Sequence, residues 1–190
     1  FLTQAEVLAV VGDASATAKG VQENAIASEV NTGTDAGRTV TPDALAGSNF
    51  GTAVIPLEAF APGTDVAAGD GAVGFQVPAE LNGMDIIGVS AFHTTVSSTD
   101  GAVATTDVQI RRERRATAST TTSADVLSTK ITIEEGELDD SYATTPAVIN
   151  AANDDLVTGD VLYIDVDAVS NSDGTSVPKG LVVNIEARLP

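Results

Sequence analysis

The feature that most constrains this chain is a series of short apolar runs, each closed by turn-forming residues, that begins at Thr52 and continues to the C-terminus. Alternation is clearest at 163–169, where three apolar residues share one face of an expected strand and Asp165 and Asp167 share the other, which we expect to be solvated. The sequence predicts strands near 53–60, 72–77, 84–96, 106–112, 126–133, 161–169 and 181–189.

These runs favour antiparallel strands, because no helical segment long enough for a parallel crossover lies between them. The chain is dominated by Ala, Val, Thr, Ser, Gly and Asp, a composition that favours strands and turns. Its 190 residues, 43% of them hydrophobic, suffice for one domain with a core and a small appendage. We therefore predict an all-β fold, an antiparallel two-sheet β-sandwich of jelly-roll-like topology, at residues 51–190.

Residues 1–50 have a different pattern and are predicted to form an N-terminal arm with short helices, which serves attachment and oligomerisation. Residues 3–6 have the form of a capping box at the start of a first helix. In a second helix, Thr41 is expected to cap, Pro42 fits the first turn and Gly47 is expected to take a left-handed stop. The arm has too few apolar residues to fold alone, so we expect it to order against its own body or a neighbouring chain.

The net charge of −18 argues against nucleic acid or anionic lipid as the main partner, because both would be repelled. The chain contains no cysteine, so disulfides and thiol chemistry are excluded. No apolar stretch approaches the length of a membrane span, and the N-terminus lacks the pattern of a signal peptide. We expect a soluble protein with no membrane partner, and the start at Phe1 suggests a processed or truncated beginning.

One segment resembles a short motif that recurs in phage tail-fibre proteins. Its recognisable parts are Glu29-Val30, Gly33-Thr34-Asp35, Arg38, Val40-Thr41-Pro42, Leu45 and Gly47. The remainder resembles a family of small proteins encoded by tailed phages, through Phe60-Ala61-Pro62-Gly63, Leu81-Asn82-Gly83-Met84, Leu127-Ser128-Thr129 and Lys179-Gly180-Leu181. Such families supply fibres, head fibres or capsid decoration, commonly as trimers. The resemblance implies a homotrimer on the surface of the virion that contacts other virion proteins such as the major capsid protein.

Catalysis is not expected. His93 is the only histidine and has no nucleophile motif with it, so a packed or surface position on a strand is the preferred interpretation. A glycosidase would need paired acids, for which the candidates are Asp139-Asp140, Asp154-Asp155 and Asp165 with Asp167. Adjacent strand residues point to opposite faces, a spacing of two suits a solvated face, and the chain has no Trp to stack on a sugar.

No cofactor or metal is expected. The possible Ca²⁺ ligands lie in loops, as Asn153-Asp154-Asp155 with Gly159-Asp160 and as Asn171 with Asp173. Neither set has the spacing of an EF-hand, so solvated turns are the preferred interpretation.

Four of the nine basic residues lie together at the end of an expected strand, as Arg111, Arg112, Arg114 and Arg115. Two interpretations remain open, a solvated loop and a set of contacts to carboxylates of an adjacent subunit or of the capsid. The second predicts that Ser at all four positions weakens assembly and leaves the body folded. Arg38, in the fibre-like segment, is a further candidate interaction residue.

The sequence therefore predicts a structural component of a tailed-phage particle, as capsid decoration, head fibre or tail fibre. The alternative is a carbohydrate- or receptor-binding module whose loop tips engage a host surface glycan.

Overall fold

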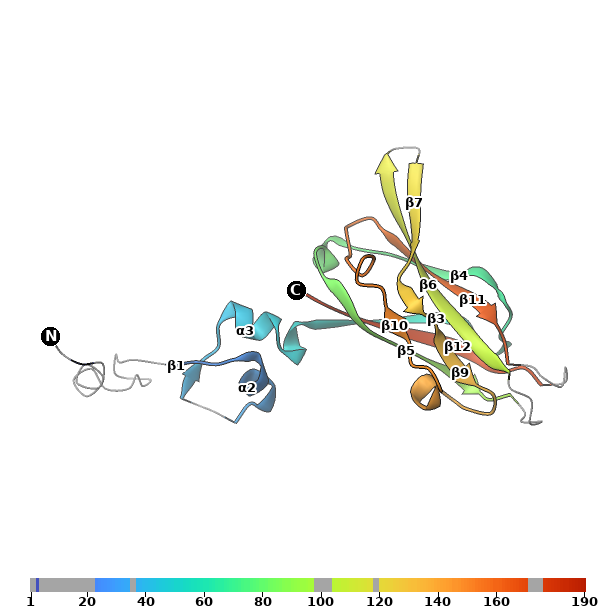
Figure 1. The fold of residues 1–190 in the computed structure, drawn as a ribbon, viewed down its shortest axis with the longest axis horizontal. Coiled ribbons are helices and arrows are strands. Elements are labelled where there is room, and N and C mark those ends of the chain that lie inside the picture. Colours follow the sequence, from blue (N-terminus) through green and yellow to red (C-terminus); the bar gives the residue numbers. More distant parts are fainter. Residues whose placement is uncertain (1–2, 4–22, 35–36, 98–103, 118–119, 171–175) are drawn as a thin grey trace. The chain divides into compact units, whose positions relative to one another are not determined.

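The structure is a computed structural model that describes residues 3, 23–34, 37–97, 104–117, 120–170 and 176–190. Figure 1 shows the order of the elements along the chain, coloured from blue to red. The chain divides into two compact units, Phe1–Thr52 with Leu189 and Ala53–Arg188 with Pro190. We describe the first as the N-terminal unit and the second as the body.

In its described residues, the N-terminal unit has two short α-helices and one pair of short strands. Strands β1 (Glu23–Asn24) and β2 (Arg38–Thr39) pair in parallel. Helix α2 (Ala27–Thr32) was not predicted; the Glu29 carboxylate accepts a hydrogen bond from the Ile26 amide at 3.0 Å, which satisfies one free donor at its start. The helix ends at Gly33, whose φ of 64° is left-handed. The helix expected from residue 3 lies outside the described residues.

Helix α3 (Pro42–Ala46) occupies the segment for which a second helix was expected. The Thr41 hydroxyl accepts a hydrogen bond from the Ala44 amide at 3.2 Å, and Pro42 stands in the first turn. The predicted left-handed stop is wrong, since Gly47 has a φ of −76° and continues into the 3₁₀ turn η1 (Asn49–Gly51). Within the described ranges, no helix combines the length and apolar character that a membrane crossing requires.

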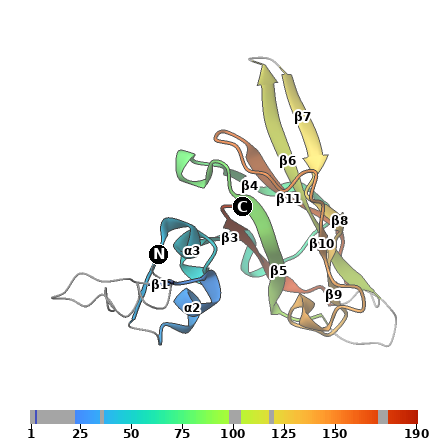
Figure 2. The same cartoon turned by 60° about the vertical axis from the view of Figure 1, so that its left-hand side comes forward.

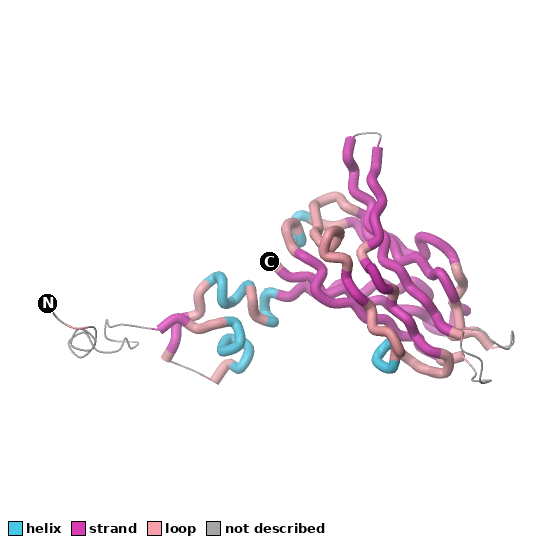
Figure 3. The backbone as a smooth tube through the Cα atoms, viewed as in Figure 1, coloured by secondary structure: helices cyan, strands magenta, loops and turns pink. Residues whose placement is uncertain are grey.

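The body contains a five-stranded sheet and a three-stranded sheet, drawn in magenta in Figure 3. The five-stranded sheet comprises β4 (Gly69–Gln76), β11 (Val161–Ala168), β6 (Thr105–Thr117), β7 (Thr120–Asp125) and β9 (Ile131–Glu134). Strand β6 pairs with β11 along one edge and with β9 and then β7 along the other, all antiparallel. The three-stranded sheet comprises β3 (Thr52–Asp65), β12 (Lys179–Arg188) and β5 (Asp85–Thr95).

Smaller elements complete the body. Strands β8 (Leu127–Thr129) and β10 (Val148–Ile149) form a separate antiparallel pair. The 3₁₀ turns η2 (Ala79–Leu81) and η3 (Asp140–Tyr142) lie in the connections.

One hydrophobic core is shared by the two larger sheets. Strands β6 and β11 contribute Val108, Ile110, Leu162, Ile164 and Val166, whereas β5 and β12 contribute Ile86, Ala91, Leu181, Val183, Ile185 and Ala187. Burying each Val, Leu or Ile side chain contributes about 1.5 to 3 kcal/mol, which makes this core the main source of stability. The body is thus mostly β with antiparallel sheets, and it is compatible with the predicted all-β sandwich.

Several strands differ from their predicted form. The run expected at 126–133 divides into β8 and β9, which pair with different strands. Strand β6 continues to Thr117, five residues beyond its predicted end, because β7 pairs with it there. Strand β7 itself was missed, since Thr120–Asp125 has no apolar alternation and forms a strand through backbone pairing and the β-branched threonines.

Candidate functional site

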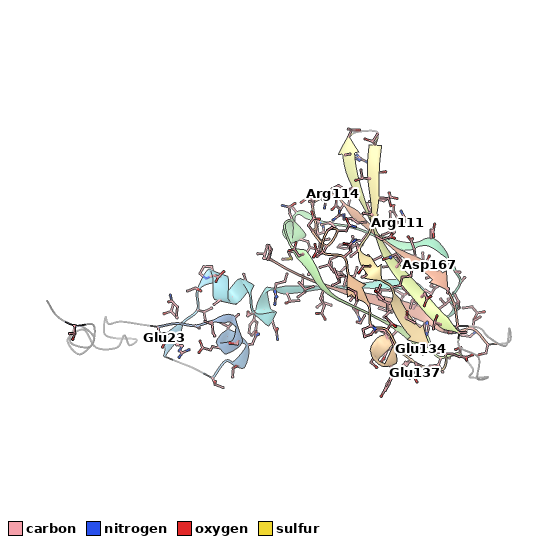
Figure 4. All side chains as sticks on the ribbon, viewed as in Figure 1. Glu23, Arg111, Arg114, Glu134, Glu137 and Asp167 are labelled. Carbon is pink, nitrogen blue, oxygen red and sulfur yellow. The ribbon has the colours of Figure 1, made fainter. Side chains whose placement is uncertain are left out.

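The arginine cluster lies within strand β6 and not in a loop. The period of two along the strand directs Arg111 and Arg115 to one face and Arg112 and Arg114 to the other. Figure 4 labels Arg111 and Arg114 at the base of the β6–β7 hairpin. The solvated-loop interpretation is therefore wrong, because β7 supplies the pairing that keeps this segment extended.

Arg111 is fixed by carboxylates of its own chain. Its Nε donates to Asp165 Oδ2 at 2.7 Å and its Nη2 to Asp165 Oδ1 at 3.3 Å, while Nη1 donates to Glu113. The guanidinium also lies 4.8 Å from the centroid of the Tyr163 ring, a cation–π contact. The hydrogen bond to Asp165 raises the pKa of Arg111, so the group stays charged.

Asp165 corrects the prediction of a solvated acidic face on β11. Its exposed fraction is only 5%. The backbone amide of Gly71, on the neighbouring strand β4, donates to Asp165 at 2.6 Å and supplements the two bonds from Arg111. These donors replace the water that a carboxylate loses on burial. Asp167, two residues further along, is exposed as predicted and pairs with Lys130 at 2.9 Å.

Arg112 and Arg114 bind the acids of the segment before β11. Arg112 is buried, and its Nη1 donates to the carbonyls of Asn153 and Asp155 at 2.9 and 2.8 Å and to Asp155 Oδ1 at 2.6 Å. Arg114 donates Nε and Nη2 to Asp160, at 2.6 to 3.1 Å, and Nη1 to Asp155 Oδ2 at 2.8 Å. The two guanidinium groups therefore bracket Asp155 and hold residues 153–160 against the sheet.

In the network of Arg112, Arg114, Asp155 and Asp160, opposite charges stabilise the charged form of each other. Hydrogen bonds to Asp160 raise the pKa of Arg114. For Asp155, partial burial alone would raise the pKa, but hydrogen bonds from Arg114 and Arg112 outweigh it and lower the pKa of the carboxyl. The buried Nε of Arg112 is not part of this network, since it has no hydrogen-bond partner among the described residues.

The same geometry bears on the Ca²⁺ candidates. Asp155 and Asp160 use their carboxylate oxygens on guanidinium groups. Over the ranges that the structure describes, no group of three or more His, Cys, Asp or Glu side chains is arranged to hold a metal ion. Asn171 and Asp173 lie outside those ranges.

Arg115 differs from the other three arginines. Its side chain is exposed, and no carboxylate among the described residues forms an ion pair with it. It borders a cavity of about 460 Å³ at the base of the hairpin, which is also lined by Gln76, Thr121, Thr158 and Tyr163. The predicted contact between the cluster and a neighbouring chain therefore stays a prediction, and Arg115 is the member best placed to make it.

Arg38, the fifth candidate, lies on β2 in the N-terminal unit. It forms ion pairs with Glu29 of α2 and, at 3.4 Å, with Glu23 of β1. Its guanidinium thus connects β1, α2 and β2.

His93 and the acid pairs have structural positions. His93 is 1% exposed, burial lowers its pKa to about 4, and its Nε2 has no hydrogen-bond partner in the described structure. Asp139 caps η3 by accepting from the Ser141 hydroxyl and, at 2.9 Å, from the Ser141 amide, and these two bonds lower its pKa. Asp140 accepts from the Ala91 amide at 3.1 Å, and burial raises its pKa. Both acids border a second cavity, of about 420 Å³.

The sequence interpretation missed the partners of the arginines, namely Asp155, Asp160 and Asp165. A signal was present, because four clustered cations in a chain with 27 acidic residues have many intramolecular partners within reach. Comparison of the chain with family models, curated proteins and solved structures found no match.

Proposed function

We propose that this chain is a non-enzymatic structural component of a tailed-phage particle, acting as capsid decoration, head fibre or tail fibre on the virion surface. The observation that carries the proposal is the apolar surface of the N-terminal unit. Among the described residues of this small unit, four large apolar side chains are exposed: Ile26 by 62%, Val40 by 49%, Leu45 by 46% and Phe50 by 76%.

The unit itself has little interior to hold these side chains. Among its described residues, only Ala25, Ala44 and Ser48 are buried. Backbone pairing, helix caps and the Arg38 ion pairs set its conformation, whereas its large apolar residues remain available. Each such residue contributes about 1.5 to 3 kcal/mol when another surface buries it. A surface of this kind suits an attachment arm that binds the major capsid protein or neighbouring subunits of a homotrimer.

The strand order of the body supports a jelly-roll topology, as a further part of the proposal. Strand β12 lies between β3 and β5, and β11 lies between β4 and β6. Strands near the start of the body thus pair with strands near its end, β3 with β12 and β4 with β11. Strand β6 pairs with β9, and both lie nearer the middle of the chain. A long antiparallel ribbon rolled into two sheets has this order, and jelly rolls occur in viral capsid and lectin domains. A shared topology does not by itself imply a shared function, so it supports the proposal only together with the exposed apolar residues of the N-terminal unit.

Deletion of residues 1–50 tests the proposal. We expect the truncated body to keep its β signal in circular dichroism and to be lost from purified phage particles. Phe50→Ser combined with Ile26→Ser should reduce incorporation without truncation. The matched control is Tyr142→Ser, because Tyr142 is 74% exposed but lies in the body. Normal incorporation of the double variant would contradict the proposal.

One observation favours the alternative of a host-glycan-binding module. The cavity of about 460 Å³ combines the Tyr163 ring with the polar groups of Gln76, Thr121 and Arg115, and sugars bind to such mixtures of ring and hydrogen-bonding groups. Glycan-array binding by the body that is lost in Gln76→Ala and Thr121→Ala would select this function.

A further inference from the structure

Edge strands of the two larger sheets differ in how they are protected from pairing with another chain. Strand β3 contains two prolines, Pro56 and Pro62, and carries Glu58 and Asp65. Strand β5 is bridged to the chain at Asp139 and Asp155. Strand β4 contains three glycines and Asp70. Proline, charge, coverage and glycine all discourage edge pairing.

Strand β7 has none of these devices over 120–124. Its sequence there is Thr-Thr-Thr-Ser-Ala, which is uncharged, free of Pro and Gly, and rich in a β-branched residue. Figures 1 and 2 both show the outer part of the β6–β7 hairpin standing clear of the other strands of the body. An isolated two-stranded ribbon is marginal in water, so a third strand would stabilise it.

The open edge of β7 presents unused backbone groups. The Asp125 carbonyl accepts a hydrogen bond from Asn153 Nδ2 at 2.9 Å, so it points away from β6. The period of two along an antiparallel strand directs the amides and carbonyls of Ser123 and Thr121 to the same side. Among the described residues, no backbone group forms a hydrogen bond with that edge at Thr121 or Ser123.

Charge indicates which chain can approach this edge. Residues 114–124 contain two arginines and no acid, whereas the whole chain has a net charge of −18. Two copies therefore repel each other over most of their surface and least at the hairpin. The edge itself carries no charge to oppose an identical strand.

We propose that β7 pairs antiparallel with β7 of a second copy of this chain. Centring the contact on Thr122 sets Thr121 opposite Ser123 of the partner subunit, and both residues then use the backbone groups that β6 leaves free. The contact is isologous, so it joins two chains and extends the sheet across a twofold axis. It goes beyond the proposed function, because it links two subunits or two trimers whatever the arm binds.

Introducing a charge of either sign at Thr122 tests the pairing. In the proposed register Thr122 faces its own counterpart, so Thr122→Lys or Thr122→Glu sets like charges opposite each other. Multi-angle light scattering of the full chain over a concentration series should give each variant half the mass of the original protein. An equimolar mixture of the two variants should restore the full mass. Thr64→Lys, on the exposed end of β3, is the matched control and should leave the mass unchanged.

Circular dichroism first establishes that each variant is folded, since Thr122 also donates a weak, exposed hydrogen bond to the Arg114 carbonyl at 3.3 Å. A second pair of variants acts on the backbone alone. Ser123→Pro removes an amide that faces away from β6 and should halve the mass, whereas Ser123→Ala should not. Equal masses for the original protein and the Thr122 variants, or a mixture that stays at half mass, would overturn the proposal.

Discussion

The two larger sheets of the body bury different kinds of residue. In β3, β5 and β12, all of whose residues are described, His93 is the one buried polar or charged side chain. In the five-stranded sheet, Thr106, Gln109, Arg112 and Asp165 are all buried beside the apolar core. The three-stranded sheet is therefore stabilised by apolar burial, whereas the five-stranded sheet also depends on charges that must remain paired.

The difference predicts how each sheet responds to change. A buried ion pair adds little net stability compared with apolar packing, but removing one member leaves the other without compensation. Single substitutions of charged residues should therefore be most damaging in the five-stranded sheet. Acid should act on the three-stranded sheet through its one histidine.

The largest effect is expected from Arg112→Ala. The substitution removes three hydrogen bonds that hold residues 153–155 and leaves Asp155 with Arg114 alone. We expect a loss of about 3 to 4 kcal/mol in the free energy of unfolding, at the low end for a buried pair because Asp155 is half exposed. Urea unfolding measures it, and a loss below about 1 kcal/mol would show that the sheet does not depend on this pair.

The second prediction concerns pH and the three-stranded sheet. Burial holds the pKa of His93 at about 4, against 6.5 for the free side chain, so between these values the unfolded chain binds a proton that the folded chain does not. The contribution of His93 to the free energy of unfolding is therefore fully present above about pH 6.5. It is lost as the pH falls toward 4, by at most about 3 kcal/mol.

Substitution of the histidine separates this contribution from that of the carboxylates. His93→Leu should flatten the pH dependence between pH 6.5 and 4, because it removes the titrating group together with an Nε2 atom that has no hydrogen-bond partner among the described residues. Unfolding by urea at several pH values measures the slope. An unchanged slope in the variant would assign the acid response to other groups.

A third, smaller effect is expected from Asp165→Asn. The substitution preserves shape but replaces a carboxylate that accepts from Arg111 and from the Gly71 amide. Hydrogen bonds to charged groups contribute about 1.5 to 3 kcal/mol, so we expect a loss of about 2 kcal/mol. Asp167→Asn is the matched control, since Asp167 is exposed on the same strand and its pair with Lys130 should contribute less than about 1 kcal/mol. Equal losses in the two variants would remove the distinction between buried and exposed pairs.

The sequence predicts the apolar part of this structure better than the charged part. Alternation located β11 and β12, because apolar residues at every second position have only one way to reach a core. Asp165 was expected on a solvated face but is buried, since its burial depends on Gly71, 94 residues away, and on Arg111 of another strand. Strand β7 has no pattern of its own and exists because β6 pairs with it. Partners this far away along the chain cannot be predicted from the local sequence pattern.

The smallest effect on stability is expected at Arg115, and it is also the most informative about function. Serine at all four arginine positions was expected to leave the body intact, but Arg111, Arg112 and Arg114 are bound to acids of the body, so that variant would unfold it. Arg115 alone is exposed without an ion pair among the described residues, and Arg115→Ser should change the free energy of unfolding by less than about 0.5 kcal/mol. If Arg115 binds a carboxylate of a neighbouring chain, the variant should still reduce incorporation into particles, most at raised ionic strength, where the remaining charge contacts are screened. Arg115→Lys should keep much of the incorporation, because it preserves the charge. Incorporation that is unchanged in Arg115→Ser across a salt series would mean that the arginines of β6 serve the fold of their own chain and nothing outside it.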